Sequence, residues 1–108
     1  MGKFVVSIRK NQEFQFNLKA ANGQIILSSE GYTTKAACMK GVESVRKNSQ
    51  VEGRFDILES KNGKVYFHLR ATNGQIIGAS EQYESLAGCK NGIQSVMKNA
   101  PDAEVVEE

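Results

Sequence analysis

Apolar and polar residues alternate through the first part of the chain, which is the pattern of strands with one buried face. Three segments carry it, at residues 4–9, 14–20 and 25–27. They are separated by KNQ at 10–12 and NG at 22–23, residue types that favour tight turns. We therefore expect a three-stranded antiparallel meander.

The pattern changes to a helical period after this meander. The apolar stripe of the predicted helix contains Cys38, Gly41, Val42 and Val45, at i, i+3, i+4 and i+7. Thr33 or Thr34 is a suitable N-cap. Lys47 and Asn48 supply a cation and a residue that tolerates the left-handed conformation, so we expect the helix to end there.

The whole arrangement occurs twice in the chain. Of the 49 positions from 2 to 50, 22 carry the same residue 51 positions further on. The segment FQFNLKAANGQII at 14–26 aligns with VYFHLRATNGQII at 65–77 without a gap. The second helix has Ser85 as its expected N-cap and Pro101 to stop it. A final segment, AEVV at 103–106, again has the composition of a strand.

This repeated order of three strands and a helix, followed by a strand, resembles the YegP-like family of small bacterial proteins. The resemblance covers essentially the whole chain and rests on the segments KAANGQII, SEGY and NGIQSVMKNAPDAEVV. It implies two β3-α-β units assembled into one sheet with exchanged terminal strands. The function of that family is uncharacterised, so the resemblance implies a fold and no activity.

We therefore predict an α+β fold in which residues 1–108 form a single domain. A tandem duplication of a β3-α(-β) unit forms one pseudo-twofold antiparallel sheet packed by two helices. Repeat one covers 2–50, repeat two covers 53–101, and 102–108 form a closing strand. Although its charges suggest a solvated tail, we expect this strand to cross to the first repeat, because the segment after the second helix has no other partner.

Composition narrows the classes of function. No stretch approaches the roughly 20 apolar residues of a membrane span, and residues 1–14 lack a secretory signal, so we expect a cytoplasmic protein without membrane contact. The net charge of +2 includes an acidic tail, without which 14 basic residues face 8 acidic ones. The sequence pI of about 8.6 lies below the value above 9 that is typical of a nucleic-acid-binding domain.

The residues that could carry chemistry have structural interpretations. Cys38 and Cys89 lack a C-x-x-C motif, so we expect buried, reduced thiols. Gly41 and Gly92 interrupt both helices at equal positions, which indicates close packing. The Ser-Glu pairs at 29–30 and 80–81 suit the approach to a helix, and the tyrosine after each pair suits a packing anchor. We expect no catalytic residues, no metal ligands and no cofactor.

One polar surface remains a candidate for binding. On the face of the sheet away from the helices, the second strand of each repeat should present Gln15, Asn17, Lys19, Tyr66, His68 and Arg70. We expect a non-enzymatic small cytoplasmic binding or structural module, monomeric because it contains its own internal pseudo-dimer, with an unknown partner. The alternative is weak binding of RNA or a nucleotide by the polar sheet face, although stacking platforms usually offer more aromatic rings than Tyr66 alone.

Overall fold

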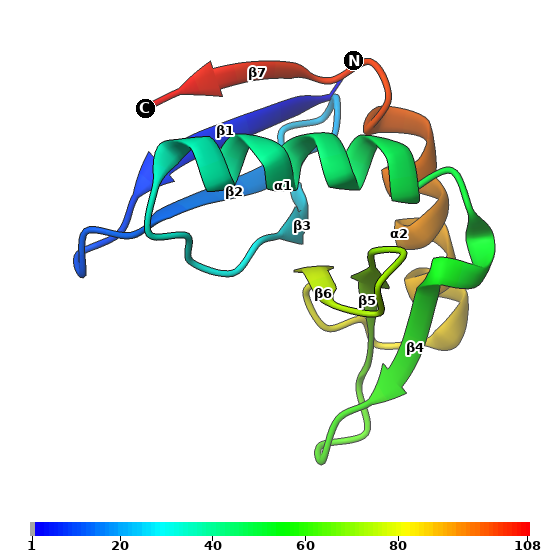
Figure 1. Ribbon diagram of the computed structural model, residues 1–108. Helices are drawn as coiled ribbons and strands as arrows, with labels where there is room; N and C mark the ends of the chain where they lie inside the picture. Colours follow the sequence, from blue (N-terminus) through cyan, green and yellow to red (C-terminus); the bar gives the residue numbers. More distant parts are fainter. Residues whose placement is uncertain (1) are drawn as a thin grey trace.

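The computed structural model describes residues 2–108 of the chain (Figure 1). The first repeat consists of β1 (Lys3–Ile8), β2 (Phe14–Lys19), β3 (Ile25–Ser28) and α1 (Lys35–Asn48). The second consists of a short 3-10 helix η1 (Glu52–Arg54), β4 (Phe55–Glu59), β5 (Val65–Arg70), β6 (Ile76–Ala79) and α2 (Leu86–Asn99). The chain ends with β7 (Glu104–Glu107). This order is the one that the repeat in the sequence predicts.

The strands form one seven-stranded sheet in the order β4-β5-β6-β3-β2-β1-β7. The two repeats meet at β3 and β6, where Ser28 pairs with Ala79 and the two halves of the sheet turn away from each other (Figure 1). β7 leaves the second repeat and pairs with β1 of the first, as expected. The β1–β7 pair is parallel, whereas the other neighbouring strands pair antiparallel.

The hairpin turns depend on one left-handed residue each. Gly23 and Gly74 have φ angles of 85° and 88°, while the asparagine before each glycine does not have a positive φ. The loops are therefore longer turns closed by a left-handed glycine, and not the two-residue type I′ turns that Asn-Gly most often makes. In the first turn of each repeat the same role falls to Gln12, with φ 72°, and to Gly63, with φ 82°.

Both helices begin where their caps predict. Thr34 Oγ1 accepts a hydrogen bond from the Ala37 amide at 3.1 Å, and Ser85 Oγ accepts one from the Gly88 amide at 3.0 Å. α1 and α2 end at Asn48 and Asn99, as expected, but without a left-handed residue, because the C-caps Ser49 and Ala100 are right-handed. The Asn48 amide instead donates to the Ser44 carbonyl one turn earlier, at 2.8 Å.

A single core joins the two repeats. α1 contacts β2 of its own repeat and β5 and β6 of the other, and α2 contacts β5 and β3 in the same reciprocal way. The largest fully buried side chains of this core are Phe4, Phe16, Phe67, Leu18, Leu27, Leu69, Val42, Val45 and Val96. Since each helix packs on strands of both repeats, neither repeat buries its apolar face alone.

The glycine in the middle of each helix makes room for a tyrosine, which confirms the packing interpretation. A Cβ atom added to Gly41 would lie 2.8 Å from Cζ of Tyr32 and 3.0 Å from Cε2 of Phe16. The Tyr32 ring stacks on Phe16 with centroids 6.2 Å apart, and Tyr83 stacks on Phe67 at 6.3 Å. Tyr32 and Tyr83 are therefore the anchors between strand and helix that their positions predict.

The serines that directly follow β3 and β6, Ser29 and Ser80, extend the sheet and do not cap a helix. Ser29 Oγ accepts a hydrogen bond from the Phe16 amide at 2.8 Å and donates one to the Glu30 carbonyl at 2.8 Å. Ser80 makes the same pair of bonds with Phe67 and Glu81, at 2.9 and 2.7 Å. The repeated Ser-Glu pairs are thus structural, with a role different from the helix capping that we expected.

Candidate functional site

The six residues of the polar face lie on β2 and β5, and all six are half-buried. Their inward-facing neighbours, among them Phe16, Leu18 and Phe67, are fully buried in the core. In the sheet, however, β3 and β6 separate β2 from β5. The structure therefore places Gln15, Asn17 and Lys19 in one group and Tyr66, His68 and Arg70 in another.

Several of these side chains are engaged within the protein. Arg9 Nε donates to Gln15 Oε1 at 2.5 Å, and Arg70 Nε lies 2.6 Å from Asp56 Oδ2. The rings of Tyr66 and His68 meet edge to face with centroids 5.4 Å apart. Nucleic-acid binding by this face stays a prediction from the sequence, and salt-dependent retention of the protein on RNA is its test.

Cys38 and Cys89 are free thiols on the buried faces of α1 and α2. Burial raises the pKa of each thiol above its ordinary value. The pKa of the neighbouring Tyr32 and Tyr83 hydroxyls is also raised, chiefly by burial and then by the nearby cysteine and glutamate. The protonated forms are favoured in the folded protein, so the thiols are poor nucleophiles at neutral pH.

We expect both thiols to react with a thiol reagent only as fast as the protein opens, far more slowly than in the unfolded chain. Labelling followed by mass spectrometry, with urea-unfolded protein as the reference, compares the two rates. Equal rates in both states would contradict this prediction.

The raised pKa values also make stability depend on pH, because the folded protein favours the protonated thiols. This contribution of the two thiols to stability is present below about pH 8.5 and is lost as pH rises.

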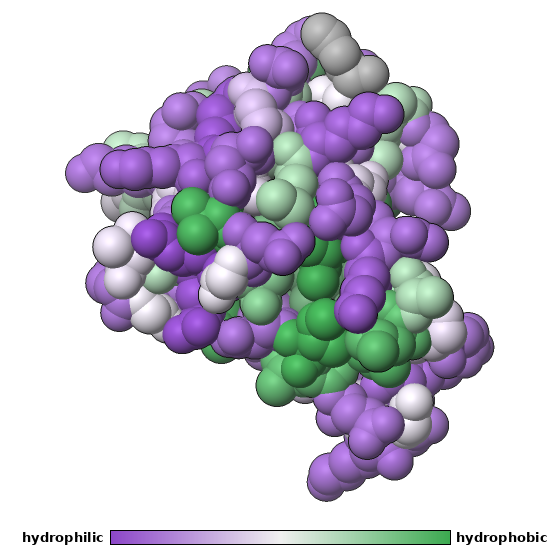
Figure 2. Space-filling view, turned by 90° about the vertical axis from the view of Figure 1, so that its right-hand side faces the viewer, coloured by the Kyte–Doolittle hydropathy of each residue, from purple (hydrophilic) through white to green (hydrophobic). Residues whose placement is uncertain are grey.

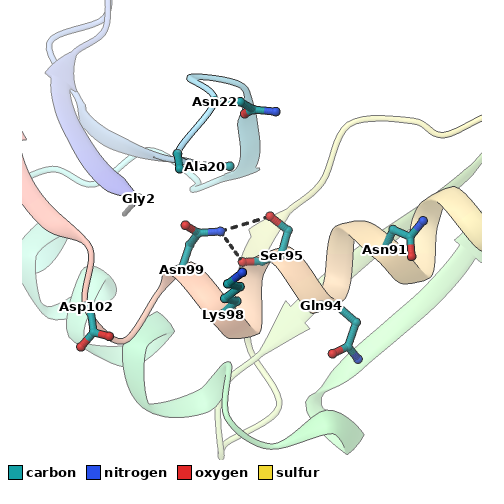
Figure 3. A pocket seen from close by; sticks show the side chains of 10 residues that line it. Gly2, Ala20, Asn22, Asn91, Gln94, Ser95, Lys98, Asn99 and Asp102 are labelled. Carbon is teal, nitrogen blue, oxygen red and sulfur yellow. Dashed lines mark hydrogen bonds between the residues drawn. The ribbon is translucent and has the colours of Figure 1, made fainter.

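A polar cleft of about 690 Å³ separates α2 from the β2–β3 turn (Figure 3). Its polar atoms are partly occupied, since the Asn99 amide donates to the carbonyl and the hydroxyl of Ser95, and Asn22 Oδ1 accepts from the Gln24 amide at 3.0 Å. The counterpart cleft lies between α1 and the β5–β6 turn. There Arg54 bridges Asn48 and Thr72. The cleft is thus a repeated seam where the helix of one repeat meets a turn of the other.

The two outer edges of the sheet differ. β7 covers β1, whereas no strand among residues 2–108 lies beyond β4, the counterpart of β1 in the second repeat. Phe4 and Val6 on β1 are consequently 0% and 3% exposed. Their counterparts on β4 are Phe55, which is half-buried, and Ile57, which is 41% exposed. The second repeat therefore has an open edge where the first repeat holds a bound strand.

A groove of about 290 Å³, lined by both apolar and charged side chains, runs along this open edge between β4 and α2. It is lined by Phe55, Ile57, Ile93, Glu52, Lys90 and Gln94. Figure 2 shows hydrophobic surface gathered low on the side of the molecule where β4 and α2 lie. We did not expect this groove from the sequence. The repeat contained an indication of the open edge, because the sequence has two first strands and only one closing strand to cover them.

Two further observations concern metal ligands and membrane spans. No three His, Cys, Asp or Glu side chains within residues 2–108 lie together as metal ligands would. In the same part of the chain, neither helix has the length and apolar character needed to cross a membrane.

Two β3-α units in one sheet, with the last strand crossing to the first repeat, define a YegP-like α+β protein of the tandem-repeat class. A family model for a domain of unknown function, DUF1508, matches the chain twice, at residues 10–56 and 60–107. The chain belongs to this family.

Relatives and solved structures agree with this assignment. The chain is 49% identical to a UPF0339 protein of Photorhabdus laumondii, over 97% of the chain and 92% of that protein. It is 46% identical to the UPF0339 protein YegP of Yersinia pestis, over 92% and 88%. The solution NMR structure of yegP from E. coli, a protein of unknown function, matches with a TM-score of 0.94 at 43% identity, over 99% of the chain and 92% of its own. These relatives are uncharacterised, so the family gives the fold and no activity.

Proposed function

We propose that the protein is a non-enzymatic, cytoplasmic and monomeric binding module that takes up an extended segment of another polypeptide as a strand along β4. The observation that carries the proposal is the contrast between the two edges. The same groove between strand and helix holds β7 in the first repeat and is open in the second. The fold therefore contains, within one chain, an example of the complex that we propose for its other edge.

The backbone at the open edge supports strand addition. In the first repeat the Val6 carbonyl accepts a hydrogen bond from the Glu108 amide at 2.9 Å, so the peptide groups of Val6 face β7. Neighbouring residues of a strand direct these groups to alternate sides, and Ile57 corresponds to Val6 in the repeat. The amide and carbonyl of Ile57 thus face away from β5, toward solvent, where an added strand would find them.

The cysteines and the histidine, which are residue types that often carry catalysis, make contacts within the fold. Both thiols are buried with raised pKa values, and the imidazole of His68 packs against the Tyr66 ring. Free thiols also suit a reducing compartment such as the cytoplasm. A nucleophile that is protonated and enclosed gives little support to an enzymatic function.

Selection of short displayed peptides on the immobilised protein tests the proposal. We expect the selected peptides to shift the NMR amide signals of β4. The substitution Ile57→Lys should weaken peptide binding about tenfold or more, because a charge at a strand edge opposes pairing with a further strand. Ile8→Lys is the matched control, since Ile8 is 61% exposed at the end of β1, away from β4. Peptides that shift other signals, or that bind Ile57→Lys as well as the wild type, would overturn the proposal.

A further inference from the structure

The strand bound in the first repeat shows how the groove recognises its occupant. Val105 lies opposite Phe4 and packs against the core. Two residues further, the Glu107 carboxylate forms an ion pair with Lys35 at the start of α1. At the other end of α1, Arg46 lies over the Phe4 ring at 5.2 Å and donates to the Pro101 carbonyl at 3.0 Å. An apolar and an acidic side chain, two residues apart, thus contact the first repeat.

The second repeat differs at the position that contacts the acidic side chain in the first repeat. Leu86 stands at the start of α2 in the position that Lys35 has in α1, and it is 49% exposed. Met97 replaces Arg46. The apolar part is kept, since Phe55, Ile57 and Ile93 correspond to Phe4, Val6 and Val42 and line the groove. At the positions of Lys35 and Arg46 the second repeat is therefore apolar, and the cation that lines its groove, Lys90, lies one helical turn beyond Leu86, where α1 has Met39.

On the basis of the strand-addition function proposed above, we infer that β4 takes a strand that runs parallel to it and carries two aliphatic residues separated by one non-acidic residue. The first aliphatic side chain takes the place that Val105 has in the first repeat, against Phe55 and Ile93. The second takes the place of Glu107 and packs on Leu86 and Ile57, which are both exposed in the unbound protein. The ligand is a segment of another protein that carries this three-residue pattern.

The residue between the two aliphatic positions lies on the outer face of the sheet. In the first repeat this position is Val106, opposite Val5. The counterpart of Val5 is Asp56, whose carboxylate is half-buried and pairs with Arg70. A second acidic side chain directly across the pair would be repelled, whereas lysine or threonine is compatible with it.

The same differences exclude the protein's own C-terminal strand from β4. Bound there in the same register, Glu107 would place its carboxylate against Leu86 without the cation that it meets at Lys35. Copies of the protein therefore do not join through β7 and β4, although each copy has an open edge. Leu86 thus favours a foreign strand and opposes self-association.

Two short synthetic peptides, blocked at both ends, test the preference. One carries valine, lysine and leucine at the three positions, and the other carries valine, lysine and glutamate. We expect the wild type to bind the leucine peptide about tenfold more tightly, because leucine packs on Leu86 and Ile57, whereas the carboxylate would lose water there without the cation that Lys35 supplies in the first repeat. Leu86→Lys restores the arrangement of the first repeat and should reverse or abolish this preference. The substitution is at an exposed position that is lysine in α1, so the fold tolerates it.

The direction of the strand is measured with a nitroxide label on the leucine peptide. A label at the peptide N-terminus should broaden the amide signals near Phe55, and a label at its C-terminus should broaden those near Glu59, which is the parallel arrangement of β7 on β1. The opposite pattern would overturn the inference.

The outcomes separate this inference from the function on which it rests. Equal binding of both peptides to the wild type, with signals of β4 shifting, overturns the sequence preference and leaves strand addition standing. No shift of β4 signals with either peptide, together with failure of the selection above, overturns both. A stable dimer of about 24 kDa in light scattering, twice the mass of the 11.9 kDa chain, with β4 at its interface would also overturn the inference, because the occupant would be a second copy.

Discussion

Replacing Gly92 with leucine is expected to lower the free energy of unfolding by about 2 kcal/mol or more, although leucine is the better helix former. A Cβ atom at this position would lie 2.7 Å from Cζ of Tyr83 and 3.2 Å from Cε2 of Phe67. Those two rings stack on each other, so the tyrosine cannot move away without losing its contact with the core. The gain in helix propensity, about 1 kcal/mol, is smaller than the cost of overpacking.

The same helix supplies a matched control. Gly88→Ala introduces a Cβ atom 3.4 Å from Ser85 Oγ and 3.6 Å from Cδ1 of Tyr83, which are ordinary contacts. The counterpart in α1 is Ala37, so the fold already holds an alanine at this position. We expect Gly88→Ala to raise stability by up to about 1 kcal/mol. Urea titrations of the two variants measure both effects, and a Gly92→Leu protein as stable as the wild type would show that the helix can shift away from Tyr83.

The features that repeat in the sequence were predictable, because each follows from local chemistry that occurs twice. Period-two alternation located the strands, Thr34 and Ser85 located the helix starts, and the offset of 51 residues related the halves. The packing role of the helix glycines followed from their equal positions. These inferences needed no knowledge of where the two repeats lie relative to each other.

Features at the junction of the repeats were not predictable in this way. Leu27 and Gly78 are counterparts, and they meet where β3 and β6 pair. A Cβ atom on Gly78 would lie 2.7 Å from Cγ of Leu27, so only one of the two positions has room for a large side chain. The helices end where expected, but their final conformation differs: the Asn48 side-chain amide donates to the Ser44 carbonyl within α1, and no left-handed residue follows.

The polar face and the open groove show the same distinction. Gln15 and Tyr66 could be assigned to one face from alternation alone, but their separation by β3 and β6 depends on the order of strands in the sheet. The exposure of Ile57 depends on a strand that is missing beside β4, and its counterpart Val6 is buried by a segment about 100 residues away in sequence. A pattern along the chain does not contain that information.

Deleting residues 103–108 should lower the free energy of unfolding by about 4 kcal/mol, a large share of the stability of a small domain. The deletion removes Ala103, which is 2% exposed, and Val105, which packs against the core. It also removes the backbone bonds of β7 to Gly2 and Val6 and uncovers the Phe4 ring. Aggregation should accompany the loss, because the apolar β1 would then form an edge of the sheet in place of the short, acidic β7. Glu104→Gln, on the exposed face of β7, is the control that keeps the strand. A truncated protein that melts with the full chain would show that β7 is not structural.

The truncated protein also allows strand addition to be tested on the edge whose natural occupant is known. A synthetic peptide of residues 101–108 should restore the melting temperature of the truncated protein in a concentration-dependent way, because it binds the folded state alone. The same peptide with Val105→Asp should not, since a carboxylate would replace the side chain that packs against the core. The peptide should leave the β4 signals of the full-length protein unshifted, because Leu86 stands where Lys35 pairs with Glu107. Restoration by both peptides alike would indicate a non-specific effect and would weaken the use of β7 as the example for β4.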